Sequence, residues 1–208
     1  AVGSHDGGYT PFDFEIQDFL NYGASNQITV RIVSPIITKD IRVDDLGPND
    51  MPHWRGGLTA GIWQSATLEF NQSAWIKHTF YKPKIKDSAF KLDLELRCNE
   101  TTPQVAILKI DVCDNKGESV YQNKQSFQLQ EGDIQLEHTI VLQDAKLWTC
   151  DSPHLYTAHA CILLNGKEIA KSIERIGLRE FTHENERFYL NGEGIYLRGG
   201  FWEGVYAK

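Results

Sequence analysis

The chain has 208 residues, of which 41% are hydrophobic and 24% are charged, and its formal net charge is -7 at pH 7. A chain of this size and composition can form one or two hydrophobic cores. The lysines and arginines are scattered, so the basic stripe of a nucleic-acid-binding protein is missing and we expect no nucleic-acid partner. The sequence contains neither a run of 18 apolar residues nor a basic start followed by an apolar block, so we expect no membrane span and no signal peptide in this chain.

The N-terminal third contains two short runs in which apolar and polar residues alternate. One run places Phe12, Phe14 and Ile16 on one face, and the other spans residues 28–32. A period of two predicts β-strands with one wet face, here separated by a turn at residues 21–23.

Residues 38–60 form the longest stretch without regular alternation. They contain Asp50 and the group His53, Trp54 and Arg55, with several glycines around them. Loops of this length in compact domains are usually functional or disordered.

The alternation returns from about residue 72 and continues to about residue 182. Turn residues divide this region into runs at spacings of ten to fifteen residues, which predicts an all-β fold built on a seven-strand sandwich. The pairs Asn165-Gly166 and Asn191-Gly192 predict hairpins, because both central positions of a type I′ turn need positive φ. Leu92, Leu94 and Leu96 alternate with polar residues, Leu108, Ile110 and Val112 repeat the pattern, and Leu136, Ile140 and Leu142 follow it more loosely.

Four cysteines, Cys98, Cys113, Cys150 and Cys161, lie in the middle of the chain. They are interpreted either as free buried thiols or as containing a Cys98–Cys161 disulfide between facing sheets. No cysteine pair has the spacing of a zinc site, and the shared strand face of His159 and Cys161 is a weak signal. We therefore expect no metal and no cofactor.

Three motifs near the C-terminus point to a family. The first is L-W-T-C-D-S-P-H-L-Y at residues 147–156, the second is G-L-R-E at 177–180, and the third is F-Y-L-N-G at 188–192. Their order and spacing resemble the end of the immunoglobulin-like domain in glycoside hydrolase family 2, which includes β-galactosidases, β-glucuronidases and β-mannosidases. The resemblance implies a sandwich at 71–183 and, at 184–208, the lead-in segment of a truncated (β/α)8 catalytic barrel.

The resemblance extends to the N-terminal region through residues 5–16 and 61–69. There the chain is similar to the end of the family's sugar-binding jelly roll, so residues 1–70 are interpreted as the C-terminal part of that domain. A partial jelly roll leaves strand edges exposed, and we expect a homo-oligomer through such edges.

The resemblance also implies the site residues. By position, Asp50, Trp54 and Arg55 correspond to a loop that reaches the substrate, and Arg198 corresponds to the arginine of the family's L-R-G motif at the base of the barrel, close to the active site. An aromatic face stacks on a sugar ring and a carboxylate accepts hydrogen bonds from its hydroxyls. No catalytic residue is assigned, because Asn185-Glu186 precedes the barrel and is predicted to be a tight turn.

The sequence therefore predicts a non-catalytic portion of an exo-glycosidase whose full-length parent hydrolyses terminal β-linked sugars. The chain alone is expected to be inactive, and the parent to be periplasmic or secreted. The alternative is a stand-alone carbohydrate-binding or adhesion sandwich. Trp148, Pro153, Leu155 and Tyr156 are expected to pack at one end of the sandwich.

Overall fold

The computed structural model describes residues 1–7, 10–32 and 61–200. The chain divides into two compact units, one formed by Ala1–Leu68 with Gly200–Lys208 and the other by Glu69–Gly199. Each unit is described by itself. In the described ranges, no helix has the length and apolar character needed to cross a membrane.

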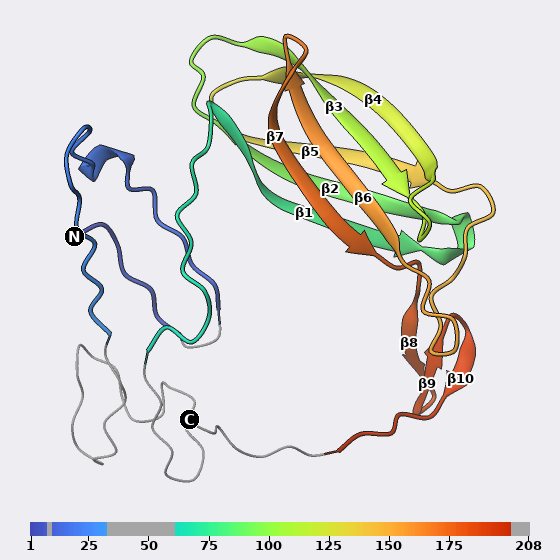
Figure 1. The fold of residues 1–208 in the computed structure, drawn as a ribbon. Coiled ribbons are helices and arrows are strands. Elements are labelled where there is room, and N and C mark those ends of the chain that lie inside the picture. Colours follow the sequence, from blue (N-terminus) through green and yellow to red (C-terminus); the bar gives the residue numbers. More distant parts are fainter. Residues whose placement is uncertain (8–9, 33–60, 201–208) are drawn as a thin grey trace, which may run out of the picture. The chain divides into compact units, whose positions relative to one another are not determined.

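The larger unit is a β-sandwich of two antiparallel sheets (Figure 1). Its seven strands run in sequence from residue 74 to residue 176, as the spacing of alternating runs predicts, so the expected all-β, immunoglobulin-like fold is confirmed. One sheet has the order β1 (Ala74–Lys84), β2 (Ala89–Cys98) and β5 (Gly132–Val141). The other has the order β4 (Ser119–Leu129), β3 (Gln104–Cys113), β6 (Tyr156–Leu164) and β7 (Lys167–Ile176).

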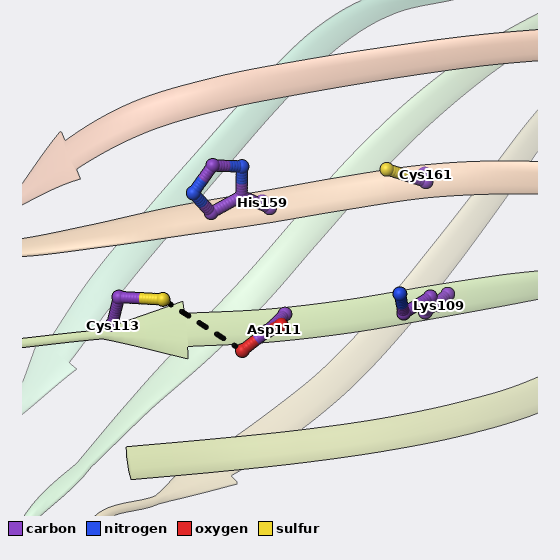
Figure 2. Close-up of a pocket in the computed structure, with 5 residues that line it drawn as sticks. All are labelled: Lys109, Asp111, Cys113, His159 and Cys161. Atoms are coloured by element: carbon purple, nitrogen blue, oxygen red, sulfur yellow. Dashed lines mark hydrogen bonds between the residues drawn. The ribbon is translucent and has the colours of Figure 1, made fainter. Parts of the chain in front are cut away.

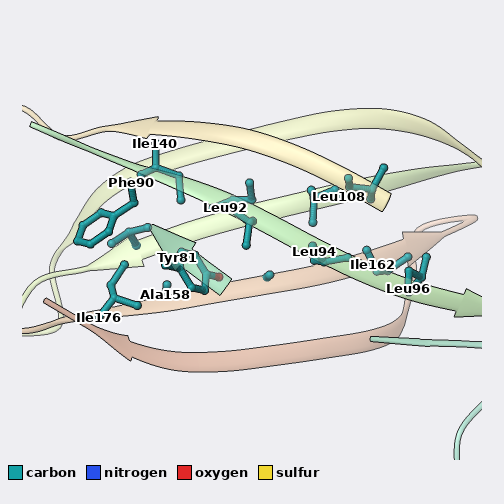
Figure 3. Close-up of a cluster of buried hydrophobic side chains, with 14 of the residues drawn as sticks. Tyr81, Phe90, Leu92, Leu94, Leu96, Leu108, Ile140, Ala158, Ile162 and Ile176 are labelled. Carbon is teal, nitrogen blue, oxygen red and sulfur yellow. The ribbon is translucent and has the colours of Figure 1, made fainter. Parts of the chain in front are cut away.

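The core lies between the two sheets and follows the alternation of the sequence (Figure 3). Strand β2 buries every second side chain, including Leu92, Leu94 and Leu96, all with no exposed surface. Strands β3 and β6 face it with residues such as Leu108 and Ile162. The side chains between them face outward, so one period-two pattern specifies both the strands and the buried face.

Side-chain hydrogen bonds connect the two sheets along both edges. At one edge the Tyr121 hydroxyl lies 2.7 Å from Nε2 of His138, whose Nδ1 lies 3.0 Å from Oε1 of Gln125. At the other edge the hydroxyls of Thr79 and Ser172 lie 3.0 Å apart. These bonds join the edge strands of one sheet to those of the other, β4 to β5 and β1 to β7.

A second, smaller sheet follows the sandwich and consists of β8 (Phe181–Glu184), β9 (Arg187–Leu190) and β10 (Glu193–Ile195) (Figure 1). Both of its connections are two-residue turns with positive φ: 48° and 61° at Asn185 and Glu186, and 54° and 83° at Asn191 and Gly192. The predicted hairpin at 191–192 and the predicted turn at 185–186 are therefore confirmed. The hairpin at 165–166 also forms, with φ of 52° and 77°.

The predicted strands at residues 12–16 and 28–32 are wrong. In the described parts of residues 1–68 the regular element is one short 3-10 helix, η1 (Gln17–Phe19), and Phe12, Phe14, Ile28 and Val30 expose 41 to 71% of their surface. Alternation marks which face a strand could bury, but a strand also needs a hydrogen-bonding neighbour and a covering layer. These residues have neither in the described structure.

The four cysteines are free thiols, so the Cys98–Cys161 disulfide is wrong; the alternative of free buried thiols is confirmed for Cys98, whereas Cys113 and Cys161 are only partly buried and Cys150 is exposed. Cys98 ends β2 on its buried face. Cys161 lies on β6 between the buried Ala160 and Ile162, and its side chain therefore faces outward. The two sulfur atoms lie on opposite sides of a sheet, which rules out a bond between them.

Candidate functional site

The residues implied to bind substrate are only partly within the described structure. Asp50, Trp54 and Arg55 lie outside the described residues, as does the whole loop at 38–60. Arg198 is described and lies exposed in the segment that follows β10. The structure therefore gives no contact between Arg198 and the other three.

The first two C-terminal motifs meet at Trp148. Its backbone N–H donates to the Leu178 carbonyl at 2.9 Å, and Trp148 also forms an isolated β-bridge with Pro153. The guanidinium of Arg179 lies over the Trp148 ring, 4.7 Å from its centroid, in the geometry of a cation–π contact. The sequence run 147–156 thus folds back against the run 177–180.

The third motif joins them through Asn191. Its backbone N–H donates to the Glu180 carbonyl at 2.8 Å, while its side-chain Oδ1 accepts from the Glu180 N–H at 2.9 Å. Its Nδ2 donates to the Trp148 carbonyl, also at 2.9 Å. We call the contacts among Trp148, Leu178, Arg179, Glu180 and Asn191 the motif junction.

Close packing at Gly177 brings the junction against the end of the sandwich. A Cβ atom at this position would lie 3.1 Å from Cδ2 of Leu155 and 3.5 Å from Cβ and Cδ1 of Trp148. The first of these distances is shorter than an ordinary contact, so the side chains approach this closely because the residue is glycine. This explains why the second motif, G-L-R-E at residues 177–180, begins with glycine.

Tyr156 is buried as predicted, whereas Pro153 is exposed and Leu155 is only partly buried. The Tyr156 hydroxyl accepts a hydrogen bond from the Lys146 N–H at 2.8 Å, and its ring packs edge-on against Phe90. His154 is 8% exposed and its ring also packs edge-on against Tyr156, 4.7 Å between centroids. Sequence reasoning missed His154, although it has the same strand parity as Tyr156.

A separate hollow of about 170 Å³ lies on the outer face of the four-stranded sheet (Figure 2). It is lined by Lys109, Asp111 and Cys113 of β3 and by His159 and Cys161 of β6. His159 and Cys161 therefore do share one face, as their spacing indicates, and that face is outward.

The chemistry of this hollow favours a satisfied polar surface rather than a reactive site. Asp111 accepts hydrogen bonds from Ser119 Oγ at 2.7 Å and from Gln122 Nε2 at 3.3 Å. Burial raises the pKa of the Cys113 and Cys161 thiols, so neither is activated toward the thiolate. Within residues 1–7, 10–32 and 61–200, no group of three or more His, Cys, Asp or Glu residues is arranged to hold a metal ion.

Glu186 does not have the setting of a catalytic acid or nucleophile. It is exposed at the tip of the β8–β9 turn, with φ of 61°. Retaining glycosidases hold two carboxyl groups about 5 to 5.5 Å apart on either side of the glycosidic bond. An exposed carboxylate at a turn tip does not form such a pair.

Comparison with known proteins identifies the sandwich. The family model described as Glycosyl hydrolases family 2 matches residues 74–179, which are the seven strands and the start of the motif junction. A β-galactosidase of Thermoanaerobacterium thermosulfurigenes is 27% identical over 207 residues, covering 95% of this chain and 27% of its own length. A β-glucuronidase of Bacteroides fragilis is 24% identical over 209 residues, covering 95% of this chain and 29% of its own length.

Solved structures give the same fold. A β-D-mannosidase from Dictyoglomus thermophilum superposes with a TM-score of 0.60 at 21% identity, covering 69% of this chain and 19% of that protein. A glycosyl hydrolase family 2 member from Bacteroides cellulosilyticus superposes with a TM-score of 0.57 at 23% identity, covering 62% of this chain and 18% of that protein. The chain thus spans less than a third of the length of these relatives. Because the family model covers half of its residues, the chain belongs to glycosyl hydrolase family 2.

Proposed function

We propose that this chain is the non-catalytic, carbohydrate-contacting support of a family 2 exo-glycosidase whose full-length parent hydrolyses a terminal β-linked sugar. The observation that carries the proposal is the motif junction, in which the family sandwich is joined to a small sheet just ahead of Arg198. Relatives that match almost the whole chain are a β-galactosidase and a β-glucuronidase. In this proposal the catalytic carboxylates belong to a (β/α)8 barrel beyond residue 208, for which residues 184–208 form the lead-in.

The surface of the sandwich favours a structural role over sugar binding. Hydrophobic side chains fill the core of the sandwich, and the hollow on its outer face is lined by Lys, Asp, Cys and His side chains, of which the Asp111 carboxylate already accepts hydrogen bonds from Ser119 and Gln122. A sugar site usually combines a concave pocket with aromatic walls and a few convergent polar groups. The residues that line this hollow include no Trp, Tyr or Phe, and their one ring is the small imidazole of His159, so the hollow does not suit a sugar ring.

Substrate contact is proposed for the loop at 50–55 and for Arg198. Trp54 would stack on a sugar ring, Asp50 would accept hydrogen bonds from hydroxyls, and Arg55 and Arg198 would supply positive charge to the same subsite. Residues 1–70 would be the C-terminal part of the sugar-binding jelly roll. A periplasmic or secreted location of the parent belongs to the same proposal.

The test is hydrolysis of chromogenic β-galactoside, β-glucuronide and β-mannoside substrates by the pure 208-residue chain. We expect no turnover above the buffer blank, because general acid catalysis and the nucleophile would both be missing. Turnover that disappears in Glu186→Gln would contradict the proposal and would make Glu186 catalytic.

A second experiment separates this proposal from a stand-alone binding module. Calorimetric titration of the chain with galactose, glucuronate and mannose should give dissociation constants no better than about 1 mM, since one aromatic and a few charges without a closed pocket bind weakly. Micromolar binding that Trp54→Ala abolishes would instead favour the binding module. Trp63→Ala is the matched control, because it removes an indole outside the proposed loop.

A further inference from the structure

In the described structure, the side chain of Asn191 connects the small sheet to the end of the sandwich by a hydrogen bond to Trp148. Among the described residues, the side chain of Asn191 makes two hydrogen bonds: one to Glu180, which directly precedes β8 and continues the β8–β9 pairing, and one to Trp148, which links the small sheet to the end of the sandwich. These partners lie 11 and 43 residues away in sequence. A two-residue hairpin turn does not need either bond to form.

The chain offers an internal comparison for this turn. Asn165-Gly166 has nearly the same backbone conformation, with φ of 52° and 77° against 54° and 83° at Asn191-Gly192. Asn165 is exposed and makes none of these contacts, whereas Asn191 is partly buried. Turn geometry alone therefore explains an asparagine at both positions, but it does not explain the three hydrogen bonds of Asn191.

The chemistry of the side chain fits both partners at once. An amide both donates and accepts, so Oδ1 takes the Glu180 N–H while Nδ2 gives a proton to the Trp148 carbonyl. Aspartate would keep the acceptor and lose the donor. Its second oxygen would then face the Trp148 carbonyl oxygen without a proton between them.

We propose that Asn191 is a positioning residue, which fixes the direction in which the chain leaves the sandwich toward Arg198. It does so by holding the β9–β10 turn against both the run that opens β6 and the run that follows β7. Its consequence for catalysis rests on the proposed function, because the barrel that follows the small sheet is part of that proposal. The structural part of the proposal is independent of any activity.

Two substitutions keep the turn and change the bonds separately. Asn191→Asp removes the donor to Trp148 but retains an acceptor for Glu180, and Asn191→Gly removes both side-chain bonds while accepting positive φ. Asn165→Asp is the matched control at the equivalent turn. All three variants leave the sandwich core unchanged.

The measurement is the orientation of β8–β10 relative to β1–β7, obtained from residual dipolar couplings of backbone amides in the 208-residue chain. In the wild type and in Asn165→Asp, one alignment tensor should fit the small sheet β8–β10 and the sandwich β1–β7 together. In Asn191→Asp and Asn191→Gly, the small sheet should need its own, weaker tensor. Hydrogen exchange at the Glu180 amide should accelerate about tenfold in Asn191→Gly, as expected for loss of one hydrogen bond.

A single tensor in both Asn191 variants would overturn the proposal, since the small sheet would then be held by other contacts. In a longer polypeptide that contains the barrel, Asn191→Asp should lower kcat/KM while the melting temperature of the sandwich stays the same. If that polypeptide proves inactive in its wild-type form, the proposed function fails, but the dipolar couplings still decide the role of Asn191.

Discussion

Removal of the Trp148 ring tests the packing of the motif junction. Trp148→Ala keeps the hydrogen bonds of the Trp148 backbone to the Leu178 carbonyl and from Asn191 Nδ2, and deletes the indole ring that lies beside Gly177 and under the Arg179 guanidinium. Truncation of a buried tryptophan costs about 3 to 5 kcal/mol. Trp148 is only partly buried, so we expect the free energy of unfolding to fall by about 2 to 3 kcal/mol.

The assay is urea unfolding followed by far-ultraviolet circular dichroism. With a slope of about 2 kcal/mol/M, the midpoint should fall by about 1 M. Arg179→Ala removes only the cation–π contact, which contributes about 0.5 to 1 kcal/mol at an exposed position, and the double variant should therefore cost less than the sum of the two single ones. An unchanged midpoint in Trp148→Ala, or strict additivity with Arg179→Ala, would refute the packing described at the junction.

Three further results are expected. Burial lowers the pKa of His138 in the folded protein, so the unfolded chain takes up a proton first as the pH falls below about 6.5 and the free energy of unfolding decreases. His138→Gln, which can still form a hydrogen bond with Tyr121, should reduce this decrease in thermal melts between pH 7 and pH 5. Glu186→Gly should raise the free energy of unfolding by about 0.5 to 1 kcal/mol, because glycine adopts φ near 61° without strain, and a lower value would contradict the turn. Leu94→Ala should cost about 3 to 5 kcal/mol in urea unfolding, against less than about 0.5 kcal/mol for Val105→Ala at an exposed position, and equal costs would place the core elsewhere.

Local patterns in the sequence were sufficient to predict the sandwich. Alternation in runs such as Leu92–Leu96 specifies a strand and its buried face together, and Asn-Gly specifies where a hairpin turns. The same alternation failed at residues 12–16, since the pattern is local whereas the neighbouring strand that completes a sheet is not. Strand parity would also have placed Cys161 outside and Cys98 inside, which excludes their disulfide.

The motif junction was harder to predict because its contacts are distant in sequence. The three motifs could be recognised separately, but the bond from Asn191 to Trp148 depends on how two chain segments 43 residues apart meet after folding. The alternation of apolar and polar residues along a strand carries no information about such a long-range contact. Asp50, Trp54 and Arg55 remain predictions, as their residues lie outside the described structure.

The two Asn-Gly turns should also differ in their rates of asparagine deamidation. In this dipeptide the glycine nitrogen can attack the side-chain amide carbon, releasing ammonia and closing a succinimide ring that water reopens to aspartate or isoaspartate. The reaction requires the amide to rotate freely over the following peptide bond. Asn165 is exposed and can do so, whereas the amide of Asn191 is held by Glu180 and Trp148. On storage at alkaline pH, Asn165 in the β6–β7 turn should therefore be deamidated first and add a negative charge there. Asn191, which connects the small sheet to the sandwich, should be deamidated more slowly.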